Sequence, residues 1–339
     1  MSFDGNKAHI VYASDDKFAE ILGVSMVSLY ENSKDMHDII VYVLDSGITV
    51  ANKQKLNLVA ESYQRSAPVW INAKDISHEL GMDIAVDRGS LSQYARLFVS
   101  SDLPSDLEKV LYLDCDIIIN KSIRELWNIN FCGKTIAALM DAFSKYYRMN
   151  IDLNSNDIMF NSGVMLIDLK RWKKNKVEQR LMEFIRSKNG MIQQGDQGVL
   201  NSVLSHETYC FDPKFNSVTV FYDFTYKEML IYRRPPRFYT KEQVEAAVKE
   251  PNVIHFTTSF LSNRPWIEGC KHKYVGEWMR YKEMSPWNNY SLWKDTRPKW
   301  RQKGLIVYRL MPGKMALYIA GFLQVYVRPI RNMMRLKRL

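Results

Sequence analysis

Short apolar runs alternate along the chain with longer segments in which apolar residues recur at helical spacing. The short runs are rich in Val and Ile, which is typical of strands buried on both faces. They predict strands at residues 9–14, 39–44, 67–73, 110–113, 135–142, 163–169 and 253–256. The amphipathic segments predict helices at residues 15–31, 91–100 and 170–187.

Alternating strands and helices predict an α/β fold with a mostly parallel central sheet covered on both faces. Ligands of such sheets bind beyond the carboxyl ends of the strands, so polar motifs at these ends are the candidates for chemistry. Neither an internal repeat nor a long Pro/Gly/Ser-rich linker interrupts the first 285 or so residues. We therefore expect one catalytic domain over residues 1–290.

Charge is distributed unevenly over the 339 residues, which carry a net charge of +10. Residues 296–339 contain eleven Lys and Arg and no Asp or Glu, whereas residues 1–295 contain 36 basic and 37 acidic side chains. A neutral body with a basic tail argues against nucleic-acid binding and favours a tail that meets an anionic surface. The composition, 46% hydrophobic and 25% charged, excludes a disordered chain.

The basic tail, residues 296–339, includes an apolar run at 315–327 that contains one polar side chain. As a helix this run spans about 20 Å, too short for a hydrocarbon core of roughly 30 Å. The flanking basic residues and the aromatic side chains predict an amphipathic anchor lying on an anionic membrane surface. The alternative is a C-terminal helix docked on the catalytic domain.

The N-terminal residues lack the basic and apolar regions of a signal peptide. The four cysteines are irregularly spaced, without a CxxC pair for zinc or redox chemistry. These features predict a cytoplasmic protein, and the basic tail predicts that it is peripheral on the inner face of the cell membrane.

Two carboxylates, Asp114 and Asp116, interrupt the apolar segment 110–119. If this segment is one strand, residues two apart share a face, so the carboxylates converge. Converging like charges in apolar surroundings need compensation, which a divalent cation such as Mn²⁺ or Mg²⁺ supplies. The alternative is a turn in which each Asp caps backbone amides.

Further motifs accompany this Asp-x-Asp pattern in a fixed order. They are Val-Tyr-Ala-Ser-Asp-Asp (11–16), Tyr-Ala-Arg-Leu-Phe (94–98), Phe-Asn-Ser-Gly-Val (160–164), Gly-Asp-Gln-Gly-Val-Leu-Asn (195–201), His-Phe (255–256) and Arg-Pro-Trp (264–266). With these motifs the chain closely resembles glycosyltransferase family 8, which includes bacterial lipopolysaccharide galactosyltransferases and glucosyltransferases and glycogenin. The resemblance covers residues 8 to about 282.

The resemblance implies a GT-A type fold that binds a UDP-sugar with Mn²⁺, or with Mg²⁺ as the alternative ion, and transfers the sugar with retention of configuration. It makes Asp114 and Asp116 metal ligands and His255 the third. Two carboxylates and an imidazole suit Mn²⁺ better than Mg²⁺.

The resemblance also assigns residues to the nucleotide. Ala13 and Asp15 would meet the uracil, although Asp15 is also a good helix N-cap. Arg96 would contact the donor sugar or the diphosphate. Arg264 stands where relatives carry Lys, after a longer 257–263 loop, and would neutralise the leaving diphosphate.

The transferred sugar is expected among five residues. Asn161, Ser162 and Asp141 would line its pocket, and Asp196 and Gln197 would act at the reaction centre, with Gln197 close to the anomeric carbon. Because the family lacks a well-placed strong nucleophile, a front-face displacement is expected.

The interpretation is a retaining hexosyltransferase that moves galactose or glucose from UDP-galactose or UDP-glucose to a lipid-linked or cell-surface glycan precursor, in lipopolysaccharide or capsule biosynthesis. One alternative is a non-catalytic UDP-sugar-binding protein that acts through a membrane partner. A second alternative is an NAD-dependent oxidoreductase. The sequence argues against it, because the first strand is not followed by the dinucleotide-binding motif GxGxxG.

Overall fold

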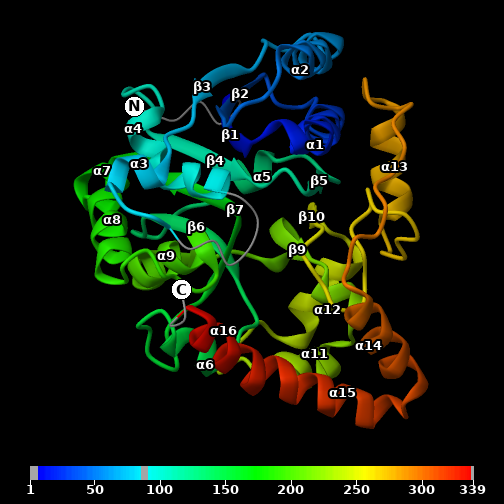
Figure 1. The fold of residues 1–339 in the computed structure, drawn as a ribbon. Helices are drawn as coiled ribbons and strands as arrows, with labels where there is room; N and C mark the ends of the chain where they lie inside the picture. Colours follow the sequence, from blue (N-terminus) through cyan, green and yellow to red (C-terminus); the bar gives the residue numbers. More distant parts are fainter. Residues whose placement is uncertain (1–6, 85–90, 337–339) are drawn as a thin grey trace.

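The computed structural model describes residues 7–84 and 91–336. It confirms an α/β fold around a mostly parallel central sheet, whose strand order is β3-β2-β1-β4-β7-β6-β8 (Figure 1). The pairs β3–β2, β2–β1, β1–β4 and β6–β8 are parallel. Strand β7 is antiparallel to both of its neighbours, β4 and β6. The strands are β1 Lys7–Ser14, β2 Asp38–Asp45, β3 Val69–Asn72, β4 Lys109–Leu113, β6 Ile136–Met140, β7 Phe160–Asp168 and β8 Thr208–Cys210.

A smaller sheet lies beside the central one, with the order β5-β10-β9. Its strands are β5 Ile117–Ile119, β9 Ser217–Val218 and β10 Val253–His255. The expectation of one strand through 110–119 is wrong, because a turn at 114–116 separates β4 from β5 and the two strands belong to different sheets. The Asp116 carbonyl accepts a hydrogen bond from the Phe256 backbone N–H at 2.9 Å, which ties this turn to the end of β10.

Helices cover both faces of the central sheet, because alternate residues of its strands enter two different cores. On β4, Leu111 and Leu113 pack into one core and Val110 and Tyr112 into the other. The helices are α1 Ala19–Asn32, α2 Val50–Ser62, α3 Ile76–Leu80, α4 Val99–Asp102, α5 Arg124–Trp127, α6 Lys145–Met149, α7 Leu169–Lys174, α8 Val177–Ser187, α9 Gly195–Leu204, α10 Val220–Asp223, α11 Tyr226–Arg233, α12 Lys241–Lys249, α13 Val275–Glu283, α14 Lys299–Leu310, α15 Gly313–Phe322 and α16 Arg328–Leu336.

The predicted helices are present but divided. The segment predicted at 91–100 forms a 3-10 helix, Leu91–Phe98, followed by α4. The segment predicted at 170–187 breaks between α7 and α8, where Lys176 has a φ of 49°. A lysine in this left-handed conformation interrupts the helical hydrogen bonds, which periodicity alone does not reveal.

Helix α13 is fixed to α1 by a buried ion pair and by a tryptophan. The Lys282 ammonium lies 2.5 Å from the Glu20 carboxylate and donates to the Trp287 carbonyl at 2.7 Å. A Cβ atom on Gly23 would lie 2.3 Å from the Trp287 ring, so only glycine at that position lets the ring approach α1.

Replacing Lys282 with Met is expected to lower the free energy of unfolding by about 3–5 kcal/mol, because it leaves the Glu20 charge buried without its partner. The matched control is Lys121→Met, whose lysine pairs with Glu250 on the surface and should cost less than about 1 kcal/mol. Urea denaturation of both variants measures the difference. Equal losses would contradict a structural role of the buried pair.

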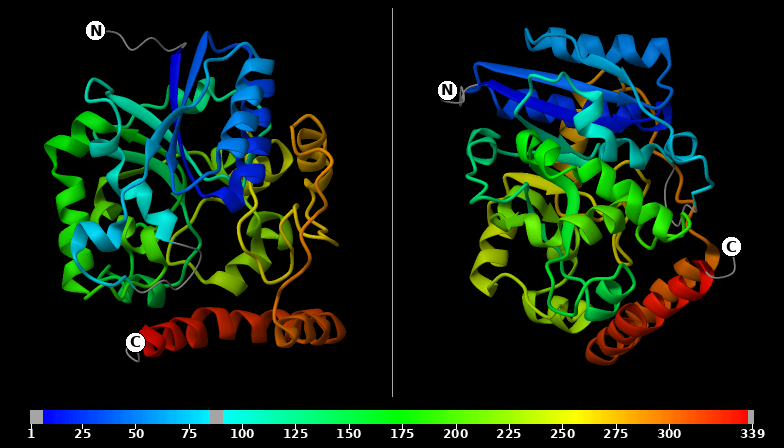
Figure 2. Two further views of the ribbon diagram at one scale, coloured as in Figure 1. Left: turned by 45° about the horizontal axis from the view of Figure 1, so that its top comes forward. Right: turned by 90° about the vertical axis from the view of Figure 1, so that its left-hand side faces the viewer.

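The C-terminal segment forms α14, α15, a π-helical turn at Leu323–Val327 and α16. From α15 to α16 it runs as one long helix across one side of the molecule (Figure 2). The Tyr147 hydroxyl on α6 donates to the Gln324 carbonyl at 3.2 Å, and the backbone of Gly321 approaches the Ile231 carbonyl on α11. The segment is therefore docked along one face. No helix within the described residues is both long and apolar enough to cross a bilayer.

Candidate active site

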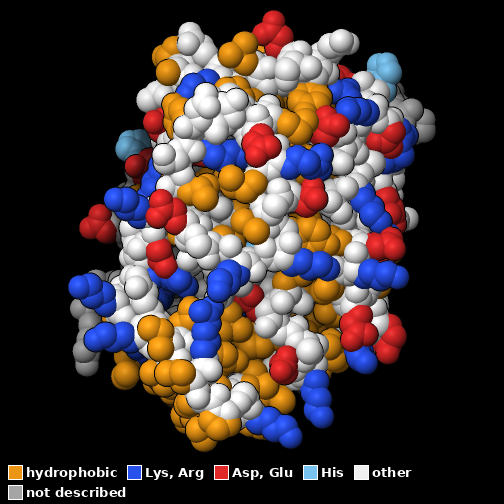
Figure 3. Space-filling view, turned by 90° about the vertical axis from the view of Figure 1, so that its right-hand side faces the viewer, with side chains coloured by type: hydrophobic (Ala, Val, Ile, Leu, Met, Phe, Trp, Pro, Cys, Tyr) orange, Lys and Arg blue, Asp and Glu red, His pale blue; other side chains and the backbone are white. Residues whose placement is uncertain are grey.

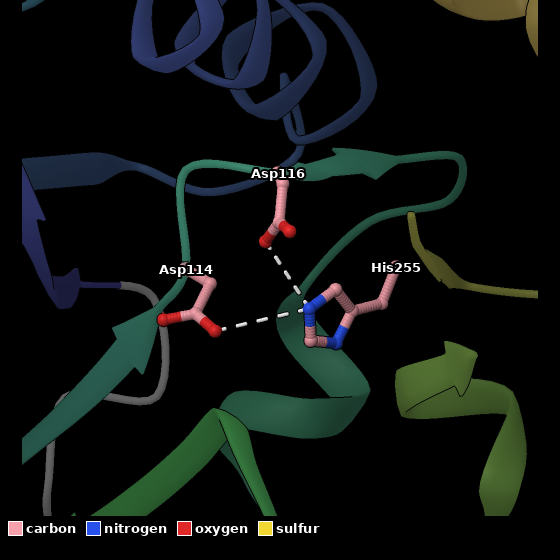
Figure 4. A group of neighbouring side chains, drawn as sticks. All are labelled: Asp114, Asp116 and His255. Carbon is pink, nitrogen blue, oxygen red and sulfur yellow. Dashed lines mark ion pairs between the residues drawn. The ribbon is translucent and has the colours of Figure 1, made fainter. Parts of the chain in front are cut away.

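Three side chains that could hold a metal ion converge where the two sheets meet. The carboxylates of Asp114 and Asp116 come from the turn after β4, and the imidazole of His255 comes from the end of β10 (Figure 4). The His255 Nε2 atom lies 3.2 Å from Asp116 Oδ1 and 3.8 Å from Asp114 Oδ2, and one ligand atom from each residue lies within 4.8 Å of the others. The two carboxylates therefore converge as expected, although a turn and not a continuous strand brings them together.

Each carboxylate of the pair also contacts a guanidinium. Arg96 lies 2.7 Å from Asp114, and Arg264 lies 3.1 Å from Asp116. Burial alone would raise the pKa of Asp116, but Arg264 and His255 outweigh it and hold this pKa at about 2. Asp116 is therefore ionised at neutral pH and ready to bind a cation.

Arg96 is a buried centre that joins the metal triad to the α9 motif. Its Nε lies 2.9 Å from the Asp196 carboxylate, and one terminal nitrogen donates to the Ser162 carbonyl at 3.0 Å. The Tyr112 ring lies under the guanidinium at 4.4 Å. Burial raises the pKa of Asp196 to about 6 in spite of Arg96. Arg96 therefore forms ion pairs with two carboxylates of the site, and its contact with the donor sugar or the diphosphate stays a prediction.

The predicted sugar-pocket residues lie on neighbouring elements. Gln197 Oε1 on α9 accepts from the Ser162 backbone N–H on β7 at 3.3 Å. Asn161 Nδ2 donates to the Asp141 carboxylate at 3.4 Å, and burial raises the pKa of Asp141. The structure therefore brings Asp141, Asn161, Ser162 and Gln197 together beside Arg96 and the triad.

Ala13 and Asp15 lie at the carboxyl end of β1, the parallel neighbour of β4. The Ala13 carbonyl accepts a hydrogen bond from the Cys115 thiol at 3.3 Å, so this turn touches the Asp-x-Asp turn. Asp15 caps the following helix, since its carboxylate accepts from the Phe18 N–H at 3.1 Å. The N-cap alternative for Asp15 is thus present in the structure, which leaves its uracil contact as a prediction.

The 257–263 loop is anchored by Asp223, whose carboxylate accepts from the hydroxyls of Ser259 and Ser262. Arg264 follows the loop and donates to the Thr258 hydroxyl at 3.1 Å. Its Nε is buried and has no hydrogen-bond partner among residues 7–84 and 91–336. An unsatisfied guanidinium nitrogen beside the triad fits an anionic ligand such as a diphosphate.

Two further residues of this site were not predicted from the sequence. A Cβ atom on Gly163 would lie 2.2 Å from the His255 ring and 2.7 Å from the Asp114 carboxylate, so glycine is needed there for the triad to form. Asn216 is fully buried and contacts His255. The signal for Gly163 was its place inside the Phe-Asn-Ser-Gly-Val motif, whereas Asn216 lies in no motif.

This fold and site define a glycosyltransferase of the GT-A type. The comparison with protein families agrees: the family model described as "Glycosyl transferase family 8" matches residues 9–269. The chain belongs to that family.

Curated relatives and solved structures cover most of the chain. General stress protein A of Bacillus subtilis is 27% identical over 83% of this chain and 94% of its own length. A lipopolysaccharide 1,2-glucosyltransferase of Escherichia coli K12 is 24% identical over 84% of this chain and 80% of its own length. The crystal structure of the galactosyltransferase LgtC with donor and acceptor sugar analogs superposes with a TM-score of 0.67, at 23% identity, over 87% of this chain and 99% of LgtC.

Proposed function

We propose that this protein is a retaining hexosyltransferase that transfers galactose or glucose from a UDP-sugar to a lipid-linked or cell-surface glycan precursor. The observation that carries the proposal is the Asp114–Asp116–His255 triad, flanked by Arg96 and Arg264. The E. coli relative, a lipopolysaccharide glucosyltransferase, supports an acceptor of this class.

The donor set fits Mn²⁺. Two carboxylates and one imidazole, with ligand atoms within 4.8 Å of one another, match the oxygen and nitrogen preference of this ion better than that of Mg²⁺. Asp114, Asp116 and His255 would hold the ion, and three protein ligands leave coordination positions for diphosphate oxygens. When bound, the ion neutralises charge on the departing UDP.

Arg264 and the β1 turn would hold the nucleotide. The buried Nε of Arg264 lacks a partner in the described chain and would donate to a diphosphate oxygen. Ala13 and Asp15, at the carboxyl end of the neighbouring strand, would contact the uracil. The result is a nucleotide spread along the edge of the sheet, with its diphosphate at the triad.

The sugar would lie over Asp141, Asn161, Ser162, Asp196 and Gln197. Asp196 is held by Arg96, and Gln197 by Ser162, so these side chains are oriented before the donor binds. Gln197 places an amide oxygen where positive charge develops at the anomeric carbon. Retention without a covalent sugar would follow if the acceptor hydroxyl attacks on the face from which UDP departs. The new C–O bond would form as the bond to UDP breaks, and the hydroxyl proton would pass to the departing diphosphate.

A panel of nucleotide sugars tests the donor assignment. Isothermal titration with UDP-galactose, UDP-glucose, GDP-mannose and ADP-glucose in the presence of Mn²⁺ should give measurable binding for one or both UDP-hexoses and a much weaker signal for the others. Preferential binding of a GDP- or ADP-sugar would contradict the assignment.

The C-terminal helices are proposed to hold the enzyme on the cytoplasmic face of an anionic membrane. Most of the large apolar side chains exposed on the described chain lie between residues 300 and 334. On the face drawn in Figure 3, hydrophobic side chains gather at the bottom of the molecule. Basic side chains such as Arg301 and Lys314 lie on the same helices, which complements anionic headgroups. In this proposal, one side of the C-terminal helices packs on the catalytic domain and the opposite side contacts the membrane.

Substitution of the outward face tests this interaction without undocking the helix. Tyr318, Phe322 and Leu323 are 54%, 56% and 50% exposed, so replacing all three with Ser should lower the partition coefficient onto anionic vesicles by at least about tenfold through lost apolar burial. Salt should weaken the binding of the wild type without abolishing it. Co-sedimentation with anionic and with neutral vesicles is the measurement.

The control replaces Val50 and Leu58 with Ser. These residues are 72% and 54% exposed on α2, at the opposite end of the molecule (Figure 1). Vesicle binding that is unchanged in the triple variant, or reduced as much in the α2 control, would contradict a membrane role of the tail.

A further inference from the structure

Asn216 is a fully buried asparagine between the metal triad and the sugar pocket. It ends a short 3-10 helix just before β9, and β9 pairs in parallel with β10, so that Val218 lies opposite His255. The Asn216 Oδ1 atom lies 3.0 Å from His255 Nδ1, and its Nδ2 donates to Asn161 Oδ1 at 2.9 Å. One side chain therefore contacts both sites.

The direction of these hydrogen bonds is set by a backbone group. The Gly163 N–H donates to Asn161 Oδ1 at 3.1 Å. Because a backbone N–H only donates, the atom of Asn161 that it meets is the oxygen. The Asn216 atom facing that oxygen is then the amide nitrogen. Its other atom, the oxygen, faces His255 Nδ1, which must carry the proton.

The consequence for His255 concerns its second ring nitrogen. With the proton on Nδ1, neutral His255 presents a lone pair at Nε2, which faces oxygens of Asp114 and Asp116 at 3.8 and 3.2 Å. Three lone-pair donors then converge, which is the arrangement a metal ion needs. In the other tautomer Nε2–H would donate to Asp116 and compete with the metal.

We propose that Asn216 is a positioning residue that keeps His255 in the metal-binding tautomer and couples it to the sugar pocket through Asn161. The inference rests on the metal and sugar sites proposed above. Asn161 in turn donates to Asp141, so the coupling extends from the third metal ligand to the far side of the pocket.

The first test is the tautomer of the protein loaded with Zn²⁺, a diamagnetic ion that carboxylates and imidazole bind. The ion is needed because without it Asp116, 3.2 Å from Nε2, would itself accept a proton from that nitrogen. Two-bond ¹H–¹⁵N correlation spectra of protein labelled at histidine, recorded above the imidazole titration range, should show His255 with the proton on Nδ1. Assignment uses a His255→Gln spectrum. A wild-type His255 with its proton on Nε2 would overturn the inference.

The second test compares two variants of Asn216. Asn216→Leu removes both hydrogen bonds, so it should move the His255 proton to Nε2 and weaken Mn²⁺ binding by about 10- to 100-fold in isothermal titration. Asn216→Asp keeps an acceptor for Nδ1–H but removes the donor to Asn161. It should retain the tautomer and most of the Mn²⁺ affinity, while kcat/KM for the UDP-sugar falls.

A control and the wild type separate the possible failures. Asn32→Leu removes a half-buried asparagine that bonds the Ile119 carbonyl and the Tyr281 hydroxyl rather than a residue of the triad, and should leave Mn²⁺ affinity unchanged. If the wild type binds no Mn²⁺, the proposed metal site fails. If the wild type binds Mn²⁺ and Asn216→Leu binds it equally well, only the inference on Asn216 fails. If Asn216→Leu does not fold, the inference is tested by the Mn²⁺ affinity of Asn216→Asp and by the His255 tautomer of the wild type.

Discussion

Asp116→Asn is expected to abolish Mn²⁺ binding at micromolar concentrations and to lower the rate of sugar transfer by about 10³-fold. An ion held by this triad would contribute several kcal/mol of charge stabilisation to the departing diphosphate, and each 1.36 kcal/mol corresponds to a factor of ten in rate. A carboxamide in place of Asp116 keeps the shape of the turn but loses the charge. The measurements are titration calorimetry with Mn²⁺ and UDP release from the donor.

The expected effect on stability is small and unfavourable. Because Asp116 pairs with Arg264 at 3.1 Å, removing its charge does more than relieve repulsion from Asp114. Arg264 is partly exposed, so water compensates most of the loss. The control Asp35→Asn removes a surface carboxylate that pairs with Arg124. Near-normal transfer by Asp116→Asn at limiting Mn²⁺ would mean that the metal lies elsewhere.

Gln197→Ala is expected to lower kcat by about 100-fold and to change the donor KM little. An interaction that strengthens as charge develops at the anomeric carbon acts on the transition state more than on the bound substrate, so its loss appears in kcat. The fold should persist, because Gln197 is half-buried and its amide oxygen bonds only to Ser162 in the described structure. Steady-state kinetics with a soluble acceptor give the two constants separately.

The control for this variant is Gln179→Ala, which truncates an exposed glutamine on α8 that bonds only Glu183 within the described residues. It should leave both constants unchanged. A kcat of Gln197→Ala equal to that of the wild type would remove Gln197 from the reaction centre and require another group there.

The sequence predicted β1 to β4, β6 and β7 of the central sheet, because strands buried on both faces are uninterrupted apolar runs. It missed the three-residue strand β8, and the strand predicted at 253–256 belongs to the smaller sheet as β10. The prediction of element boundaries was wrong where a turn or a left-handed residue interrupts a strand or helix while the hydrophobic pattern continues on both sides. The turn at 114–116 lies inside an apolar segment, so the hydrophobic pattern alone predicts one continuous strand there. Similarly, the left-handed residue Lys176 divides a helix whose amphipathic pattern continues on both sides.

The candidate site was predicted from motifs and not from its contacts. Residues in the motifs, such as Arg96 and His255, are found together as expected. Asn216 could not be predicted, because its importance arises from the pairing of β9 with β10, which no local pattern encodes. For the same reason the ion pair of Arg264 with Asp116 depends on how the 257–263 loop folds back to the triad.

The sequence did not decide how the C-terminal segment packs. Its apolar run predicted either a membrane anchor or a docked helix. The structure shows docking through residues such as Leu317 and Val325, which are buried, while Tyr318 and Phe322 remain exposed one position or turn away. Since a helix has several faces, one apolar run can serve two surfaces.

The central claim is that this site performs metal-dependent transfer from a UDP-hexose. The most direct measurement is UDP release from UDP-galactose and UDP-glucose, with an oligosaccharide acceptor, in Mn²⁺ and in EDTA, followed by the proton NMR coupling constant of the product anomeric centre. The account predicts release that requires Mn²⁺ and a product with the α configuration of the donor. Release that continues in EDTA, or a β-linked product, would contradict it.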